Sequence, residues 1–90
     1  MGRDPAGQYI IYVPPLIVEV LSPSNTAEKT NRQRMIAMSA GTKEFWVVDA
    51  ARRTVLVTTL KSTQLYTEAD NIPVRLLGKK AIAANRIFAV

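Results

Sequence analysis

The apolar and polar positions of the first half of the chain predict a strand, a helix and a second strand. Residues 16–21 (LIVEVL) are apolar on both faces, which predicts a short strand at the centre of a sheet. Alternation along this strand places Glu19 on the same face as Pro15, Ile17 and Leu21. A carboxylate among apolar neighbours is costly to bury unless a metal ion or a basic side chain meets it. The strand alone leaves both a metal ligand and a structural ion pair open.

Residues 22–25 (SPSN) predict a turn into a helix that runs to about residue 40 and stops at Gly41. Asn25 is one candidate for the N-terminal cap, because Glu28 follows it at the spacing of a capping box, and Ser24 is the other. The first half of this helix is polar and basic, and the second half is apolar. We therefore expect the second half to pack on the sheet and the first half to border a more open region.

The rest of the chain alternates short β-prone runs with turns. The further strands that we expect are Tyr9–Val13, Glu44–Asp49, Thr54–Leu60, Gln64–Thr67 and Ile72–Leu77, and residues 81–89 form either a short helix or an extended tail. The strand, helix and strand at the start predict a right-handed crossover between parallel strands, with the next strand antiparallel. Pro73 confines its strand to an edge. The pattern predicts an α/β fold with a mixed β-sheet and one main helix.

Composition narrows the chemistry. The chain has 90 residues, enough for one domain, and carries a net charge of +5 from twelve Lys and Arg against seven Asp and Glu. A positive charge favours a polyanionic partner such as DNA. There is no cysteine and no histidine, which excludes disulfides, thiolate or imidazole zinc sites and histidine-based catalysis. A metal site would have to use oxygen ligands, which suit Mg or Mn.

The sequence gives no sign of a membrane segment. No run approaches the roughly 20 apolar residues of a span, and residues 1–8 (MGRDPAGQ) lack the apolar segment of a signal peptide. Together with the absence of cysteine, this predicts a cytoplasmic protein without membrane contact.

Two segments carry a more specific signal. They are residues 14–29 (PPLIVEVLSPSNTAEK) and residues 43–57 (KEFWVVDAARRTVLV), with Gly41 between them. In these residues the chain resembles the bacterial putative restriction endonuclease family of the PD-(D/E)xK nuclease superfamily. Nine positions match the family pattern without gaps: Glu19, Ser22, Pro23, Ser24, Gly41, Glu44, Phe45, Trp46 and Asp49. The tail RLLGKKAIAANRIFA is similar to the closing segment of the family.

The resemblance implies a restriction-endonuclease-like fold, truncated at its N-terminus. Members of the family are longer and carry a helix and strands, with an upstream Asp, before the part seen here. We therefore divide the chain into a lead-in and short strand over residues 1–13 and a partial restriction-endonuclease-like domain over residues 14–90.

The resemblance also implies a chemistry. In these nucleases, acidic residues hold one or two divalent ions beside the scissile phosphate, and a lysine orients the attacking water. Carried over to this chain, Glu19 is the metal ligand and a catalytic residue, and Lys29 is the second catalytic candidate. Lys29, Arg32 and Arg34 of the helix are the candidates for contact with nucleic acid. A solvated helix face is the alternative for Lys29 and Arg32.

Two positions depart from the family pattern. Pro15 stands where the family usually has Asp, four residues before Glu19 and on the same strand face, and proline supplies no ligand. Gln33 stands where the helix usually has Lys, and its amide carries no charge. Lys29 lies one turn earlier on the same stripe and substitutes only in part.

Other conspicuous residues have structural explanations. Phe45 and Trp46 are expected in the core rather than stacked on bases. Asp49 is expected to cap the turn that follows its strand, with a second metal ligand as the alternative. Arg52 and Arg53 are expected in a solvated turn, where contact with phosphate is the alternative.

We therefore expect metal-dependent phosphodiester hydrolysis of DNA in complete relatives, with Mg or Mn as cofactor, and weak or lost activity in this chain. The alternative is a non-catalytic remnant that acts as a homo-oligomerising or nucleic-acid-binding module. A half-domain leaves the edge of its central strand and one sheet face uncovered, and a second copy can cover them. We accordingly expect a homodimer.

Overall fold

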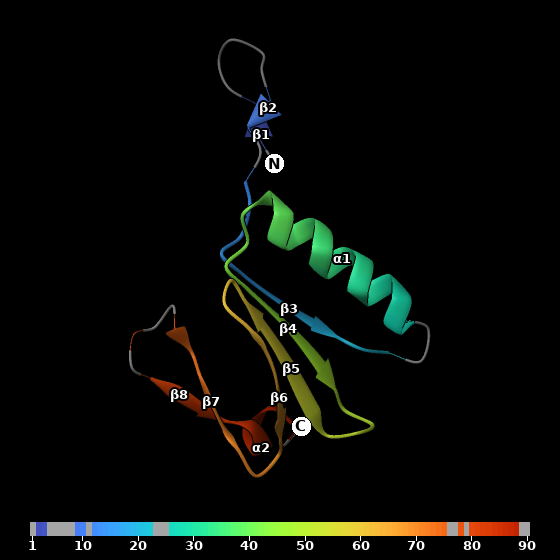
Figure 1. The fold of residues 1–90 in the computed structure, drawn as a ribbon, viewed down its shortest axis with the longest axis vertical. Helices are drawn as coiled ribbons and strands as arrows, with labels where there is room; N and C mark the ends of the chain where they lie inside the picture. The colour runs from blue at the N-terminus through green and yellow to red at the C-terminus, as the bar shows by residue number, and fades with distance from the viewer. Residues whose placement is uncertain are drawn as a thin grey trace.

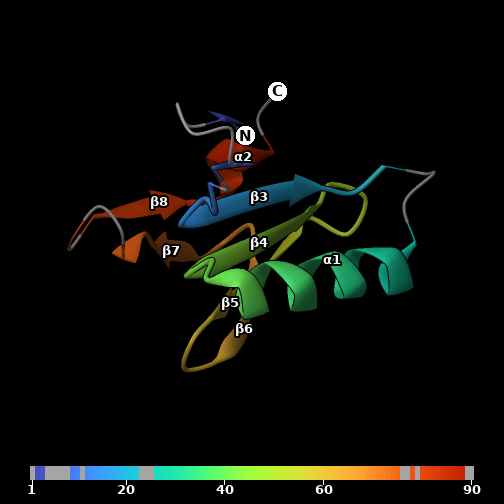
Figure 2. The same cartoon turned by 90° about the horizontal axis from the view of Figure 1, so that it is seen from above.

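A computed structural model describes residues 2–3, 9–10, 12–22, 26–75, 78 and 80–88. Its centre is a four-stranded sheet in the order β3-β4-β5-β6, with α1 on one face and β7, β8 and α2 on the other (Figures 1 and 2). The strands of this sheet are β3 (Leu16–Val20), β4 (Glu44–Asp49), β5 (Thr54–Thr59) and β6 (Thr63–Thr67). The helices are α1 (Ala27–Ala40) and α2 (Ala84–Ile87).

The order and direction of the strands agree with the sequence pattern. β3 and β4 are parallel and are joined by α1, with Glu19 opposite Val47 in the register. β5 is antiparallel to β4, and β6 is antiparallel to β5. β6 begins at Thr63, one residue earlier than we expected, and β5 ends at Thr59, one residue earlier.

The expectation that LIVEVL forms the central strand was wrong. Among the described residues β3 pairs only with β4, so it is an edge strand, and Val18 and Val20 are 49% and 58% exposed. The central, most buried strand is β4. Apolarity on both faces indicates which side chains need cover, but it does not specify a backbone neighbour on each side. No described segment supplies that neighbour on the outer edge of β3.

The hydrophobic core lies on the face of the sheet that is turned away from α1. Its buried residues are Trp46, Val48, Val55, Val57, Ile72, Val74 and Ala84, with Leu16, Tyr66, Ile87 and Phe88 packed against them. On the α1 face, the buried apolar side chains of β4 are Phe45 and Val47. Phe45 and Trp46 are thus both in the interior, as expected. The C-terminal segment therefore provides most of the cover that closes the core.

The N-terminal cap of α1 is Thr26, and the expectation of Asn25 or Ser24 was wrong. The Thr26 hydroxyl accepts a hydrogen bond of 3.1 Å from the backbone N–H of Lys29. Asn25 and Ser24 lie outside the described residues. With the cap at Thr26, the third helical residue is Lys29, so the capping box that required Glu28 at that position is not formed. Glu28 still places its negative charge in the first turn, where the helix dipole favours it.

Gly41 ends α1, as expected. Its φ of 119° lies in the left-handed region, and the N–H of Thr42 donates to the carbonyl of Ala37 at 3.0 Å. This bond and the glycine form the usual C-terminal motif of a helix.

The packing of α1 differs from the expectation. Its buried residue is Thr30, in the first half. In the second half Ala37 and Met38 are half-buried, whereas Met35 and Ile36 are 66% and 64% exposed. The apolar residues of the second half spread around the helix, so one face cannot bury them all.

The C-terminal segment forms β7 (Asn71–Pro73) and β8 (Ala81–Ala83), which pair antiparallel, followed by the single turn of α2. The expectation of either a helix or a tail over residues 81–89 was therefore incomplete, because both a strand and a helix form. Pro73 lies at the end of β7 in this two-stranded sheet, consistent with an edge position. Leu77, the expected end of this strand, lies outside the described residues.

The N-terminal segment is not only a lead-in. β1 (Gly2–Arg3) pairs antiparallel with β2 (Tyr9–Ile10), and this hairpin projects away from the main sheet (Figure 1). The expected strand over residues 9–13 is thus shorter, because Tyr12 and Val13 are not in a strand. In the part of the chain that the structure describes, no helix is long and apolar enough to cross a bilayer.

The turn between β4 and β5 is organised by its charged residues. Asp49 accepts a hydrogen bond of 3.1 Å from the backbone N–H of Arg52, which confirms its expected role as a turn cap. Arg53 has a φ of 54°, forms a 3.0 Å ion pair with Glu68 and lies 5.6 Å from the ring centroid of Phe88. Arg53 lies in an exposed turn, as expected, and it also links this turn to the C-terminal segment.

Candidate metal and nucleic-acid site

Glu19 lies on the face of the sheet that carries α1. Its opposite residue across the sheet is Val47, which lines a groove together with residues of α1. This placement depends on the local fold at the start of β4, where the backbone N–H groups of Lys43 and Glu44 donate to the carbonyl of Pro15 at 2.9 and 3.0 Å. These bonds fix the register of β3 against β4 and thereby the position of Glu19 along the sheet, opposite Val47.

The Glu19 side chain is half-buried, and among the described residues no ion pair or hydrogen bond reaches its carboxylate. The structural ion pair that the sequence left open is therefore not formed among these residues. The carboxylate of Glu19 is therefore available to a ligand as far as the described residues are concerned.

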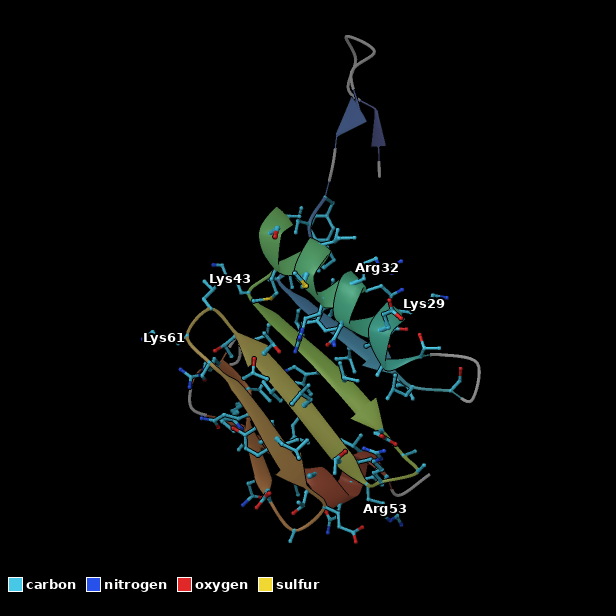
Figure 3. All side chains as sticks on the ribbon, turned by 45° about the vertical axis from the view of Figure 1, so that its right-hand side comes forward. Lys29, Arg32, Lys43, Arg53 and Lys61 are labelled. Carbon is cyan, nitrogen blue, oxygen red and sulfur yellow. The ribbon has the colours of Figure 1, made fainter. Side chains whose placement is uncertain are left out.

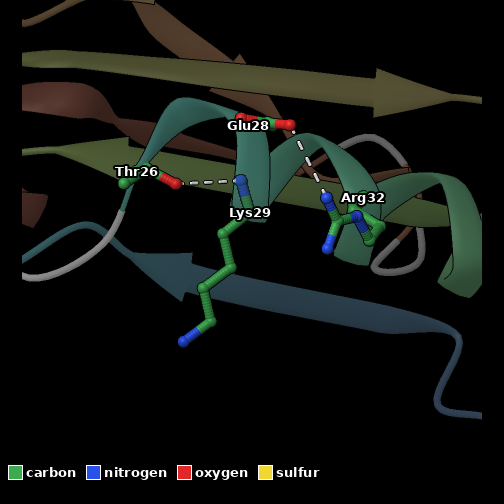
Figure 4. Close-up of polar contacts among 4 residues, drawn as sticks. All are labelled: Thr26, Glu28, Lys29 and Arg32. Atoms are coloured by element: carbon green, nitrogen blue, oxygen red, sulfur yellow. Dashed lines mark hydrogen bonds and ion pairs between the residues drawn. The ribbon is translucent and has the colours of Figure 1, made fainter.

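Lys29 and Gln33 lie on the flank of α1 that is nearest to β3. The rotation of the helix is fixed on its other flank, where the guanidinium of Arg34 donates a 3.4 Å hydrogen bond to Thr58 of β5. Since successive helical residues are about 100° apart, Gln33 and Lys29 lie on a different side of the helix from Arg34. Figure 4 shows the side chain of Lys29 extending from the helix toward β3. Both side chains are exposed, and in Figure 4 the ammonium group of Lys29 points away from Glu28 and Arg32.

The two arginines of α1 differ in their availability. Arg32 is exposed and forms a 3.6 Å pair with Glu28, one turn earlier (Figure 4). A pair this exposed contributes little to stability and is readily exchanged for another anion. Arg34 is half-buried between the helix and β5, where its bond to Thr58 gives it a structural role. Of the expected nucleic-acid contacts, Lys29 and Arg32 are the accessible ones.

A groove of about 240 Å³ lies between the N-terminal half of α1 and the sheet. Its walls include Ala27, Thr30 and Asn31 of the helix and Val47 and Asp49 of β4. This is the open region that the polar first half of the helix predicted. The groove is close to the Glu19 position, because Leu21, two residues along the same strand face, also lines it.

Asp49 is the second carboxylate on this face. The register places it two residues beyond the partner of Glu19, so the two Cα atoms are roughly 8 Å apart by ordinary sheet spacing. The carboxylate of Asp49 is already engaged by Arg52, through the backbone N–H at 3.1 Å and the side-chain Nε at 3.9 Å. Its use as a turn cap therefore competes with its use as a metal ligand.

The residues present do not fit a tightly held divalent ion. No group of three or more acidic residues that could hold a metal occurs among the described residues. Glu19 offers one free carboxylate, Asp49 is committed to Arg52, and Pro15 contributes only its backbone carbonyl, which accepts from β4. Mg²⁺ in phosphate-processing sites is usually held by one or two carboxylates together with substrate and water, so a single carboxylate gives weak binding.

The basic side chains are distributed over the surface. Figure 3 shows Lys29 and Arg32 on α1, Lys43 and Lys61 close together at one end of the sheet, and Arg53 at the other end. The end of the sheet that carries Lys43 and Lys61 was not expected as a site from the sequence. The burial of Glu44, which is only 2% exposed, was not expected either. The signal that was available is an acid at the start of a strand followed two residues later, on the same face, by a tryptophan whose indole N–H can donate to it.

Comparisons with known proteins bear on both the family and the fold. A model of the Uma2 family, described as "Putative restriction endonuclease", matches residues 2–85. Among solved structures, the chain is similar to one described as a putative nuclease belonging to DUF820 from Anabaena variabilis. The identity is 20%, the TM-score is 0.79, and the match covers 97% of this chain and 52% of that chain. A comparison with curated proteins found no match.

The structural match confirms the fold class. At 20% identity the likeness bears on the fold alone, and the chain spans about half the length of the nuclease from Anabaena variabilis. The mixed sheet with one main helix, expected from the sequence, is the arrangement that the two structures share. The family match covers nearly the whole chain, including the segments around Glu19 and Trp46. The chain therefore belongs to the Uma2 family of putative restriction endonucleases.

Proposed function

We propose that this chain is a nuclease-like domain that binds the DNA backbone at the side of α1 facing β3. In complete relatives this face would serve metal-dependent hydrolysis of phosphodiester bonds, and in this chain the activity is weak or lost. The observation that carries the proposal is the free carboxylate of Glu19, half-buried on the helix-facing side of the sheet. Nothing in the described fold requires an acid there, whereas a phosphodiesterase of this family does.

The distribution of charge supports binding more than catalysis. Lys29 is accessible on the β3 side of the helix, and Arg32 is held only by an exposed pair. Both can neutralise phosphate, which is the main source of affinity for DNA. Turnover needs more, because the metal and a lysine must offset the charge that develops on the phosphate. Gln33 cannot do this, and Glu19 alone gives a weak metal site.

The activity is tested with supercoiled plasmid and Mn²⁺. We expect little or no nicking by the wild-type chain above the background of plasmid incubated without protein, and the matched control Glu28→Ala should nick to the same extent as the wild type. Any cleavage that does occur must be lost in Glu19→Ala. Glu28 is a suitable control because it is also an acid near the N-terminus of α1 but is exposed and paired with Arg32. Robust cleavage that persists in Glu19→Ala contradicts the proposal.

A gain-of-function variant tests the cause of the weakness. Pro15→Asp combined with Gln33→Lys restores the two family residues that this chain lacks. If Mn²⁺-dependent nicking rises at least tenfold, the departures from the motif account for the weak activity. If it does not rise while the variant remains folded by circular dichroism, the deficit lies in parts of the longer relatives that have no counterpart here.

A second candidate function is homo-oligomerisation, and the open edge of β3 favours it. The strand has exposed Val18 and Val20 on one face and no neighbour on its outer side among the described residues. Met35 and Ile36 add a shallow apolar surface on α1. An unprotected edge with apolar side chains pairs readily with an identical edge, which would extend the sheet across a twofold axis.

A further inference from the structure

Glu44 is a buried acid that has no part in the Glu19 site. Its side chain is 2% exposed, and Oε1 accepts a 3.1 Å hydrogen bond from the indole N–H of Trp46. The other oxygen, Oε2, is buried and has no hydrogen-bond partner in the described structure. A buried carboxylate oxygen without a donor is strongly disfavoured, so this oxygen calls for a donor that the described residues do not supply.

Two adjoining hollows border this carboxylate. The smaller is about 10 Å³, room for about one oxygen-sized atom, and the wider groove is about 190 Å³. Glu44, Thr59 and Arg75 line both of them. The hydroxyl of Thr59 is already bonded to the backbone of the β5–β6 turn, which leaves it little capacity for another partner.

Three cations surround the same groove. Lys43, Lys61 and Arg75 line it, and none of them is in an ion pair within the described residues. Figure 3 shows the two lysines at the same end of the sheet. Three positive charges beside one buried carboxylate leave a net excess of about two positive charges, which favours an anion over a free metal ion.

The buried acid restricts the kind of anion. A fully deprotonated oxyanion such as sulfate would face Oε2 of Glu44 oxygen to oxygen, without a proton between them. An oxyanion that retains a proton can donate its O–H to Oε2 while its other oxygens accept from the cations. One oxygen of such an ion matches the size of the smaller hollow, and the rest of the ion fits the wider groove.

We propose that Glu44, Lys43, Lys61 and Arg75 form a site for a protonated phosphate group. The O–H of the phosphate donates to Glu44, and the three cations bind the remaining oxygens. The site is separate from the Glu19 face, because Glu44 starts β4 and points to the core face, whereas Glu19 lies near the far end of β3 and points toward α1. The proposal does not depend on nuclease activity.

The chain provides its own reporter for this site. Trp46 is its single tryptophan, and its indole N–H is bonded to the carboxylate that would receive the phosphate proton. Titration with inorganic phosphate, at constant ionic strength and near neutral pH, should change the fluorescence of Trp46 and saturate. Titration with sulfate under the same conditions should give at least tenfold weaker binding. Equal binding of both ions, or no effect of phosphate because water alone fills the hollow, overturns the proposal.

Variants separate the acid from the cations. Glu44→Gln should bring the affinities for phosphate and sulfate within about twofold of each other, measured by calorimetry because the substitution also alters the surroundings of Trp46. Lys61→Ala should weaken the binding of both ions several-fold and leave the ratio of their affinities unchanged. Lys80→Ala, an exposed lysine outside the groove, should change neither. If Glu44→Gln does not fold, the ratio of phosphate to sulfate affinity in the wild type and the effect of Lys61→Ala test the proposal. A wild-type affinity ratio near one rejects the site.

The phosphate could be free or could end a nucleic-acid strand, and competition distinguishes the two. A terminal phosphate monoester regains its proton below about pH 6, so the comparison is made at about pH 5.5. Displacement of inorganic phosphate by a 5′-phosphorylated oligonucleotide, but not by the same strand with a 5′-hydroxyl, identifies the strand end as the ligand. Displacement by neither supports the free ion. Equal displacement by both strands indicates general attraction of DNA and overturns the specific site.

Discussion

Glu19 and Glu44 are acids in apolar strands, but their surroundings give them different roles. Glu19 is half-buried beside a groove and has no partner among the described residues, whereas Glu44 is 2% exposed and accepts a hydrogen bond from the indole of Trp46. Truncating the Glu44 side chain would break the hydrogen bond from the Trp46 indole, whereas truncating Glu19 breaks no hydrogen bond of the described structure. The two residues thus give different tests of stability.

At the residue scale, Glu19→Leu should raise the free energy of unfolding by about 1 kcal/mol, because it replaces an unpaired acid with an apolar side chain among apolar neighbours. Urea denaturation monitored by Trp46 fluorescence measures the change. Glu28→Leu, at an exposed helix position, is the matched control and should change stability by less than about 0.5 kcal/mol. A clear loss of stability in Glu19→Leu would mean that the acid has a structural partner after all.

Single-residue properties were predictable where they depend on local sequence. The burial of Phe45 and Trp46 follows from the apolar run around them, and Asp49 caps its turn because short acids bond to nearby backbone N–H groups. The spacing of Glu44 and Trp46 indicated that the two side chains could bond, but it did not indicate burial, because an acid next to Lys43 at a strand end is ordinarily solvated. Pro73 and Arg75, which border the same hollow as Glu44, are distant in the sequence, and no local pattern reveals them.

At the element scale, the two ends of α1 differ in how well their capping residues could be predicted. Three polar residues in succession, Ser24, Asn25 and Thr26, can each accept a backbone hydrogen bond, so the pattern did not distinguish between them. Gly41 has no competitor at the other end, and its prediction was correct.

Thr26→Ala should lower the free energy of unfolding by about 1 kcal/mol, because the N–H of Lys29 loses its acceptor at the start of the helix. Thr26→Ser keeps the hydroxyl and should lie within a few tenths of wild type. Chemical denaturation of both variants, followed by circular dichroism, checks the difference. If the two variants are equally destabilised, the contribution of Thr26 comes from packing of its methyl group rather than from the cap.

The position of β3 could not be inferred from its own residues. Its apolar pattern predicted cover on both faces, and the structure shows Val18 and Val20 largely uncovered on one of them. Which strand occupies each neighbouring position is a property of the whole sheet. The direction of β3 was predictable, because a helix between two strands allows a parallel pairing.

At the scale of the whole molecule, the net charge of +5 should make DNA binding strongly dependent on salt. We expect the double variant Lys29→Ala/Arg32→Ala to weaken binding to any duplex sequence and to reduce the slope of log affinity against log salt by about 2. Lys80→Ala/Arg86→Ala, which removes the same charge elsewhere, is the control. Fluorescence anisotropy at several salt concentrations measures both slopes, and equal slopes for the two double variants would argue against the α1 face.

Self-association should depend on one particular edge of the sheet. Val18→Lys places a charge on the exposed side of β3 and should shift a dimer to monomer without loss of stability. Leu65→Lys does the same on β6, the opposite edge strand, where Leu65 is 62% exposed. Sedimentation velocity compares the two. Dissociation by Leu65→Lys alone would assign the contact to β6, and a monomeric wild-type chain would remove this candidate function.

The core lies on one side of the sheet, and the candidate DNA face lies on the other. Most of the buried apolar side chains pack between the sheet and the C-terminal segment, whereas the buried residue of α1 itself is Thr30. Substitutions in the helix can therefore alter ligand contacts while the protein keeps most of its folding energy. Within a lineage, such an arrangement would let a ligand-binding face change while selection continues to maintain the scaffold.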